Sequence, residues 1–483
     1  MSAGLPDLLV LSAYLLGVVL FGVWVGRAQK GVADYMLGDR DLPWWGLLFS
    51  IVATETSTVT FLSIPGFAFS RDMTWLQLAL GFVAGRLVVV ALLLPHYFKG
   101  EIFTAYEVLD RRFGGPTKQT ASLLFIVTRS LADGLRLFLT AIVLQEMARI
   151  PLAAAVAIIG VTTIAYTFFG GMKAVVWTDV AQFVIYLLGA AVAFVILLSE
   201  LPGGWRTLLA TGAANGKLRV FDFTWSLSEP HVFAAGALGG LFLTIGSHGA
   251  DQLMVQRYLC ARGEREAGRA LALSGLVVLV QFAFFLLIGV GLFCFYDAFP
   301  PARAFDHPDR VFARFIVERM PPGLLGLVLG AVFAAAMSTL SSSLNSSATA
   351  AVNDLYRPLL RPGASSGHLL SATRAFTIVF GLVQIAVGIG GQFLSASVVS
   401  SVLTIAGFTT GIILGVFFLG IFTKRVGQEA ALAGMVMGLV GMTVVAFATP
   451  LAWPWYAMVG SLGTLALGLL ASLVWPAGPA RPR

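Results

Sequence analysis

Long apolar runs separated by short polar segments make up most of this 483-residue chain. A run of about 20 apolar residues can cross the hydrocarbon core of a bilayer as a helix, whereas the strands of a membrane barrel would show short alternating segments. The pattern therefore predicts an all-α polytopic membrane protein. We expect thirteen spans, roughly at 5–26, 44–70, 74–97, 119–147, 151–169, 174–199, 231–259, 267–296, 322–352, 369–391, 394–421, 427–449 and 453–475.

Two of these spans are interrupted. The middle of the second span, residues 53–60, is almost entirely polar or β-branched, and in the seventh span Gly246 and Gly249 bracket a Ser-His pair. Such interruptions free backbone carbonyls, which the bilayer tolerates only where they face a cavity or a ligand. The other interpretation is a pair of kinks that serve helix packing.

The two interruptions occupy matching places in two halves of the chain, five spans apart. That arrangement is typical of a transporter whose binding site is formed between inverted repeats. We therefore expect a single membrane domain over 1–483. Its repeats are expected at about 44–199 and 231–421, with extra helices at 5–26, 427–449 and 453–475.

A stripe of hydroxyl residues marks the ninth span. Ser338, Ser341, Ser342 and Asn345 follow each other at i, i+3, i+4 and i+7 in the uncharged segment 333–349, so they share one helix face. Hydroxyls of this kind stabilise contacts between membrane helices. They are also, together with carbonyls, the ligands that a hard cation prefers.

The charge distribution predicts the orientation of the chain. Charged residues make up 11% of the sequence and the net charge is +7, against about 25% charged residues in a soluble domain. The short loops on one side hold only Arg71 and Arg149, while most basic residues, including the group 257–269, lie on the other. The positive-inside rule then places the N-terminus outside and the C-terminus in the cytoplasm. The rule also accounts for the net positive charge, so we expect no nucleic acid partner. The expected location is the cell membrane.

A few ionisable residues lie inside the spans, where they are expensive and are candidates for function. Asp133 has Arg129 four residues before it and Arg136 three residues after it, so an ion pair with either leaves one arginine for an anionic substrate or for Glu55. The full set is Glu55, Arg86, Arg129, Asp133, Arg136, Asp179 and Asp251.

Three of the remaining polar groups allow more than one interpretation. Asp179 is either a helix-end carboxylate near Lys173 or the anionic ligand of a cation. Asp251 is expected in a network with nearby arginines, and His248 as a hydrogen-bonding group of the pore lining. The two cysteines, Cys260 and Cys294, fall at opposite ends of one span, so we expect no disulfide between them.

Several motifs resemble the sodium:solute symporter family, whose members carry sugars, proline, pantothenate, iodide or sialic acid with sodium. They appear in the order of the family over about residues 35–425. The matching stretches are FLSIPGFAF (61–69), TAYEVLDRRFG (104–114), AYTFFGGMKAVVWTDVAQ (165–182), DQLMVQRYL (251–259) and AAAMSTLSSSLNS (334–346). The resemblance implies a LeuT-like five-plus-five inverted repeat.

The resemblance also implies sites for the coupling ion, Na⁺. The main site would use backbone carbonyls of the first broken helix and hydroxyls of the stripe, which correspond here to Ala53, Thr56, Ala335, Ser338 and Thr339. A second sodium site of some members corresponds to Asp179, Ser341 and Ser342, with Ser338 shared.

A substrate pocket between the repeats is likewise implied by the family. Its candidate residues are Ser57, Thr60, Gln77, Arg129, Arg136, Thr244, Ser247, Thr404 and Thr409. Ser247 stands where sugar carriers have a tyrosine, and either arginine matches the residue that holds a carboxylate in the sialic acid branch.

We therefore predict a sodium-coupled symporter that imports a small organic anion, amino acid or sugar by alternating access. A proton-coupled carrier of the same fold, titrating at Asp179, Glu55 and His248, is the alternative; a channel or a sensor is a further one. No nucleophile–base pair or metal cluster suggests an enzyme. The lipid bilayer and the solute are the expected partners, and a monomer is expected to suffice.

Overall fold

The structure is a computed structural model that describes residues 4–27, 31–301, 303 and 305–476. In this part of the chain the regular elements are all helices, joined by turns and loops, with two isolated bridge pairs. The longer elements are α1 (Leu5–Gly26), α3 (Trp44–Glu55), α4 (Thr58–Ser70), α5 (Leu76–Val88), α8 (Gly115–Ala148), α9 (Leu152–Glu200), α10 (Gly204–Ala214), α11 (Gly240–Gly249), α12 (Gln252–Leu259), α13 (Glu264–Ala298), α14 (Arg310–Arg319), α15 (Leu324–Ala350), α17 (Ser366–Gly390), α18 (Ala396–Phe422), α19 (Gln428–Ala448) and α20 (Tyr456–Ala471).

Short elements connect or extend these helices. They are α2 (Val32–Leu37), α6 (Leu94–Tyr97), α7 (Glu107–Phe113) and α16 (Arg357–Leu360), the 3₁₀ turns η1 (Gly38–Arg40), η5 (Gly391–Phe393) and η6 (Trp453–Trp455), and the π turns η2 (Val89–Leu93), η3 (Ala235–Gly239) and η4 (Ala351–Tyr356). Cys260 and Cys294 are both buried and free.

The prediction of thirteen spans is not confirmed by length and hydropathy. Nine helices of the described residues are long and apolar enough to cross a membrane, or ten if the bent pair of α3 and α4 is one span. The other predicted spans differ for identifiable reasons. The fifth and sixth predicted spans are joined in α9, which has 49 residues with a break inside it. Helix α8 carries the charged residues of the fourth predicted span, and the seventh is divided into η3, α11 and α12.

Helix α9 contains a break at Gly171. Its 49 residues would extend for about 74 Å if straight, more than twice the roughly 30 Å thickness of the hydrocarbon core. Gly171 has φ 50° and ψ −157°, a conformation that only glycine adopts without strain, and it is buried. The break lies between the fifth and sixth predicted spans, 151–169 and 174–199.

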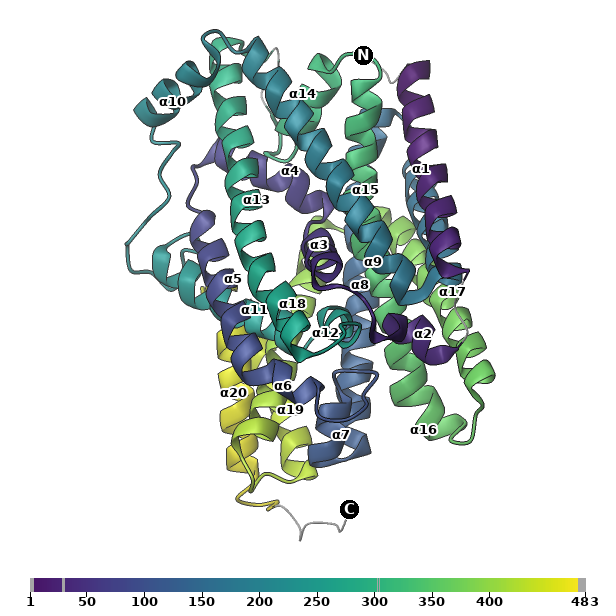
Figure 1. The fold of residues 1–483 in the computed structure, drawn as a ribbon. Coiled ribbons are helices and arrows are strands. Elements are labelled where there is room, and N and C mark those ends of the chain that lie inside the picture. The colour runs from purple at the N-terminus through teal and green to yellow at the C-terminus, as the bar shows by residue number, and fades with distance from the viewer. Residues whose placement is uncertain (1–3, 28–30, 302, 304, 477–483) are drawn as a thin grey trace.

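The two ends of the bundle carry the segments that the charge distribution predicts on opposite sides. The start of α1 lies at the upper end in Figure 1 with α10 and α14, whereas α7 and α16 lie at the lower end. We call these ends the upper and the lower face. Segments predicted on the outer side of the membrane, α10 and α14, thus lie at one face, and segments predicted in the cytoplasm, α7 and α16, lie at the other.

Helices α3 and α15 lie in the interior of the bundle, and α3 contacts α9, α13 and α15. The most apolar window of the α15 span is 78% buried, against 17% for α1 at the periphery. Because α15 is enclosed on all sides, its hydroxyl residues face protein rather than lipid. This position brings the stripe against the interrupted helix α3.

Candidate ion and substrate sites

The first break lies where the sequence predicts it. Helix α3 ends at Glu55 and α4 begins at Thr58, and the link between them is extended at Thr56 (φ −85°, ψ 93°) and Ser57 (φ −87°, ψ 168°). The Ser57 hydroxyl accepts from the backbone N–H of Thr60 at 3.3 Å and so caps α4. The chain bends by 60° between the two helices.

The Thr56 side chain holds this break in place. Its hydroxyl oxygen accepts from Tyr186 at 3.2 Å and from the Gln281 amide at 2.6 Å, and it donates to the Val52 carbonyl at 2.9 Å. These contacts come from α9 and α13, so two neighbouring helices fix the conformation in which the end of α3 offers its carbonyls.

The second break lies a few residues further along the chain than the sequence predicts. The prediction placed it at Gly246–Gly249, but α11 continues through these residues to Gly249 and ends before Asp251. The Asp251 carboxylate accepts from the backbone N–H of Leu253 at 2.9 Å, so it is the N-cap of α12. The Asp251 cap fixes the start of α12 and so the place where α11 ends. Gly246 lies inside α11, where its lack of a side chain lets the helix approach Thr410 closely.

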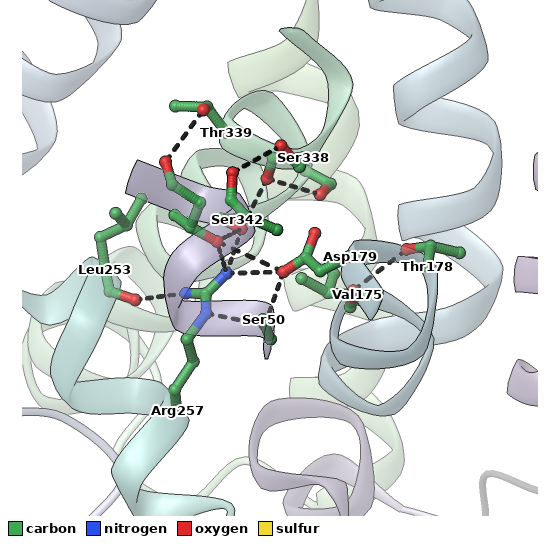
Figure 2. A network of polar contacts seen from close by, with 12 residues as sticks. Ser50, Val175, Thr178, Asp179, Leu253, Arg257, Ser338, Thr339 and Ser342 are labelled. Atoms are coloured by element: carbon green, nitrogen blue, oxygen red, sulfur yellow. Dashed lines mark hydrogen bonds and ion pairs between the residues drawn. The ribbon is translucent and has the colours of Figure 1, made fainter. Parts of the chain in front are cut away.

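The upper part of the stripe meets the end of α3. Ser338 Oγ donates to the carbonyl of Ala53 at 2.9 Å and lies 3.2 Å from the carbonyl of Ala335. Thr339 Oγ1 donates to the carbonyl of Thr54 at 3.0 Å. Figure 2 shows Ser338 and Thr339 with dashed lines to neighbouring oxygen atoms. The structure thus brings four of the five predicted ligands of the main site to one place, and adds Thr54.

This set of oxygens has the chemistry of a site for a hard monovalent cation. All of its members are hydroxyls or carbonyls, which are the ligands that such ions prefer, and Ala53, Ala335 and Ser338 are fully buried. The Ser338 hydroxyl and the carbonyls of Ala53 and Ala335 would offer lone pairs to an ion placed between α3 and α15. The residues present therefore fit sodium.

Asp179, on α9, lies one turn lower and hydrogen-bonds two side chains of α3. Its Oδ2 accepts from Ser50 at 2.6 Å and from Thr54 at 3.3 Å. Its Oδ1 is buried and makes no hydrogen bond. A buried carboxylate oxygen without a partner is costly, so this atom is a second observation that favours a cation here.

The predicted ligands of the second site are only partly joined. Ser342 Oγ lies 3.1 Å from Thr54 Oγ1 and donates to the carbonyl of Ser338 at 2.7 Å. Ser341 Oγ donates to the same carbonyl at 3.1 Å. Both serines line the turn below Ser338, and Ser342 shares its hydrogen-bonded neighbours with Asp179.

Arg257 is a functional candidate that the sequence analysis missed. It was assigned to the basic residues that follow the seventh span, yet its side chain is only 1% exposed. Its Nη2 lies 3.0 Å from Asp179 Oδ2 and hydrogen-bonds Ser342 (Figure 2). Of the two interpretations of Asp179, the helix-end carboxylate near Lys173 is wrong, because its ion-pair partner is Arg257. An arginine whose neighbours in QLMVQRYL (252–259) are all uncharged is the signal that indicates burial.

A cavity of about 490 Å³ lies beside the first break, between α3, α8, α11 and α18. Seven of the nine predicted substrate residues line it, namely Ser57, Thr60, Arg129, Arg136, Thr244, Ser247 and Thr409. Trp75, Phe82 and Trp453 form part of its apolar wall. A volume of this size suits a small organic solute.

Two predicted substrate residues lie elsewhere. Gln77 is fully buried and binds the loop before η3, with Nε2 3.0 Å from the carbonyl of His231 and Oε1 3.1 Å from the N–H of Asp222. Thr404 lines a second cavity of about 660 Å³, which shares Leu243 and Trp453 with the first and reaches His307 near the upper face. The substrate cavity therefore continues towards the upper face.

The arginines of α8 differ in their pairing. Arg129 Nη2 lies 2.5 Å from Asp251 Oδ2 and Arg129 Nη1 lies 3.7 Å from Asp133, whereas Arg136 Nη1 lies 2.6 Å from Asp133. The expected network of Asp251 with an arginine is thus present. The side chain of Arg136 is 41% exposed and that of Arg129 16%, so Arg136 has more free donor capacity towards the cavity.

Glu55 and His248 form a polar cluster on another side of the same cavity. Glu55 pairs with Arg86, not with an arginine of α8, which corrects the alternative raised from the sequence. His248 Nε2 lies 3.4 Å from Glu55 Oε1, and its Nδ1 lies 3.0 Å from the Ser247 hydroxyl. His248 is therefore a hydrogen-bonding residue of the cavity wall.

The sequence compares with known proteins over nearly its whole length. A sequence model of the sodium:solute symporter family matches residues 35–438. The chain is 30% identical to the sodium/sialic acid symporter SiaT of Proteus mirabilis (strain HI4320) over 479 residues, which cover 97% of this chain and 95% of that protein. The sodium/sialic acid symporter NanT of Aliivibrio fischeri is 30% identical over 484 residues, with 98% and 94% covered. The human sodium/iodide cotransporter is 29% identical, with 90% and 69% covered.

Solved structures agree with this result. A Na⁺-coupled sialic acid symporter in a substrate-bound outward-open state superposes with a TM-score of 0.91 at 29% identity, over 98% of this chain and 99% of that one. The nucleobase-cation-symport-1 transporter MHP1 superposes with a TM-score of 0.61 at 16% identity, over 93% and 95%, and supports the fold alone. The all-α, LeuT-like fold predicted from the sequence is thereby confirmed.

Proposed function

We propose that this chain, which belongs to the sodium:solute symporter family, imports a carboxylate-bearing organic solute of the sialic acid type. It is a multi-pass membrane transporter whose coupling ion is sodium. The two relatives with most of their length covered are sialic acid symporters, and another carries iodide. An anion is therefore the substrate class that these relatives favour.

The observation that carries the substrate class is the position of Arg136. It lines the cavity, is the more exposed of the two arginines, and makes one ion pair on one of its nitrogens. A planar guanidinium with free donors binds a carboxylate through two parallel hydrogen bonds. We assign the substrate carboxylate to Arg136 and give Arg129, which bridges two carboxylates, a role in joining α8 to the second break.

The hydroxyl residues of the cavity complete the substrate site in this proposal. Ser57 and Thr60 come from the first break, Thr244 and Ser247 from α11, and Thr409 from α18. Each offers one donor and an acceptor. A hydroxylated acid can satisfy them while its carboxylate reaches Arg136, which a halide ion cannot do.

The main sodium site is proposed at Ala53, Thr56, Ala335, Ser338 and Thr339. Ser338 joins the end of α3 to α15 directly, and Thr339 does so one residue later. An ion held by these oxygens favours the state in which α3 and α15 are close, and orders the cavity beside Ser57. Because this coupling is reciprocal, substrate raises the affinity for sodium by the factor with which sodium raises that for substrate.

The remaining features of the transporter are proposed from the charge distribution and the pattern of repeats. The upper face is the extracellular one, as the positive-inside rule predicts, and the protein lies in the cell membrane with its C-terminus in the cytoplasm. The chain is one membrane domain with repeats at about 44–199 and 231–421, and a monomer suffices. It catalyses no reaction and needs no nucleic acid partner.

The test uses the full chain in proteoliposomes with an inward sodium gradient. We expect accumulation of radiolabelled N-acetylneuraminic acid that stops when choline replaces sodium at fixed pH. Accumulation that persists in choline and follows a proton gradient instead would support the proton-coupled alternative, for which Glu55 and His248 stand 3.4 Å apart at the cavity. Sodium-driven uptake of iodide or lactate, with none of the sialic acid, would overturn the substrate.

Arg136→Gln separates the role of the guanidinium from that of the fold. We expect the KM for the carboxylate solute to rise by about 10–100-fold, because a bidentate charged contact is lost, while the sodium dependence of thermal stability stays unchanged. Arg149→Gln, at the exposed end of the same helix, is the matched control and should leave the KM unaltered. An unchanged KM in Arg136→Gln would refute the assignment.

A further inference from the structure

Arg257 places a fixed positive charge among the oxygens of the second ion site. Its Nη2 lies 2.5 Å from Thr54 Oγ1 and 3.0 Å from Asp179 Oδ2, and it also hydrogen-bonds Ser342 Oγ. These three oxygens come from α3, α9 and α15. A single nitrogen of the guanidinium therefore contacts the three helices on which a bound ion would act.

The rest of the guanidinium is tied to its surroundings. Arg257 Nε donates to Ser50 at 3.0 Å and Nη1 donates to the carbonyl of Leu253 at 2.6 Å. The side chain is 1% exposed and that of Asp179 is fully buried. The charge is thus held in place by hydrogen bonds on every nitrogen and cannot be screened by water.

The two oxygens of Asp179 have different environments. Oδ2 accepts from Arg257, Ser50 and Thr54, whereas Oδ1 is buried and has no partner. In Figure 2 the oxygen without dashed lines points away from the guanidinium. Oδ1 is the atom that remains available to a cation, so Arg257 leaves the second site open.

The pair is already electrically neutral before any ion arrives. A sodium ion on Oδ1 adds a net positive charge to a buried group of neutral total charge, and it stands close to the guanidinium of Arg257. Repulsion between like charges is strong where the effective dielectric constant is low. The fixed charge therefore weakens the attraction of Asp179 for sodium.

We propose that Arg257 is an affinity-setting residue of the second sodium site: it keeps the binding of sodium at Asp179 weak, so that this ion leaves readily after the conformational change. This inference rests on the second site implied by the family and concerns a residue outside its ligand set. Arg257 is a positioning residue, since it holds the Asp179 carboxylate and adds its charge nearby without being a ligand of the ion.

Sodium titrations of the purified full chain test the proposal. The readouts are ²²Na⁺ binding and the midpoint of thermal unfolding as a function of sodium concentration, with choline keeping the ionic strength constant. Wild-type protein should show a tight and a weak component, and Asp179→Asn should lose the weak one. In Arg257→Gln the weak component should tighten by about tenfold or more, the factor for a modest charge–charge interaction.

Three further variants make the result decisive. Arg257→Lys retains the charge and should keep sodium affinity near that of the wild type. Arg262→Gln removes an arginine five residues further on, whose side chain is 54% exposed, and should change neither component. The double variant Asp179→Asn/Arg257→Gln restores the charge balance and should bind only the tight ion.

Arg257→Gln leaves a buried carboxylate without its partner, and the proposal predicts that sodium replaces the lost charge. The variant should therefore be unstable in choline and recover in high sodium. Sodium affinity that is unchanged or weaker in folded Arg257→Gln would overturn the proposal, as would a variant that high sodium does not stabilise. The proposed function would survive either outcome, because sodium-driven uptake by the wild type tests it separately.

Discussion

The two candidate ion sites lie one turn apart on α15, yet they are built from different chemistry. Around Ser338 all oxygens are neutral hydroxyls and carbonyls, with hydrogen bonds of 2.9 and 3.2 Å. Around Ser342 a carboxylate and a guanidinium meet, with 3.0 Å between Arg257 Nη2 and Asp179 Oδ2. A neutral cage acquires its charge only when an ion binds, so its geometry depends directly on sodium. A charged pair that is already balanced holds the helices together with or without an ion.

The comparison gives the two turns different roles. In the proposed account the upper turn, at Ser338 and Thr339, would be the part that senses sodium, because only neutral hydrogen bonds join α15 to α3 there. The lower turn, at Ser342, is a joint between α3, α9 and α15 through Arg257, and in the proposed account a second ion would bind there weakly. Substitutions along the stripe should therefore separate ion dependence from stability.

The largest effect is expected at the lower turn. Asp179→Asn leaves the guanidinium of Arg257 buried without its counter-charge, and breaking a buried pair in this way costs about 3–5 kcal/mol. The measurement is the loss of thermal stability in detergent, with Asp179→Asn/Arg257→Gln as the variant that should regain most of it. A single variant as stable as the wild type would show that the pair does not join the helices.

Ser338→Ala should have the next largest effect, and on a different observable. It removes a hydroxyl that faces the carbonyls of both α3 and α15. Because loss of even an outer contact lowers metal affinity by about 10–100-fold, we expect sodium-dependent uptake to fall by about 100-fold or more, with thermal stability in choline nearly unchanged. Uptake with wild-type sodium affinity would contradict the main site.

Ser342→Ala should produce a smaller change. Its hydroxyl hydrogen-bonds Arg257 and lies 3.1 Å from Thr54 Oγ1, and a hydrogen bond to a charged group contributes about 1.5–3 kcal/mol. Thermal unfolding should show this loss, while the sodium concentration for half-maximal uptake stays close to the wild-type value. A large shift in that concentration with no loss of stability would reverse the roles of the two turns.

Ser346→Ala marks the end of the stripe and should have the smallest effect. Its hydroxyl donates only to the carbonyl of Ser343 within the same helix, at 3.2 Å, so removing it should cost no more than about 1 kcal/mol. Uptake and sodium dependence are expected within about twofold of the wild type. A loss as deep as that of Ser338→Ala would extend the ion site along the whole stripe.

Much of this fold could be predicted from the sequence because apolar length and helical periodicity are local properties. The break after Glu55 and the face shared by Ser338 and Ser342 could be read directly from residue order. The second break was misplaced by a few residues, because the cap of Asp251 outweighs the flexibility of Gly246. The number of spans is not confirmed, because charge in α8 and the turn at Gly171 depart from a simple hydropathy pattern.

The parts of the site that could not be predicted depend on contacts between distant segments. Arg257 resembles a loop residue until α12 folds under α3, and only then does it meet Asp179. Gln77 and Thr404 have suitable chemistry, but the rotation of their helices turns them to a loop and to the upper cavity. Rotation is set by packing against neighbours, which residue order does not reveal.

The most direct test of the central claim is equilibrium binding of ²²Na⁺ to purified protein, with wild type compared to Ser338→Ala/Thr339→Ala. The double variant removes both hydroxyls that join α15 to the end of α3. We predict that it loses the tight sodium component, and that the weak component, which depends on Asp179, remains. Tight sodium binding at wild-type affinity in the double variant would show that the ion bridging α3 and α15 is held elsewhere.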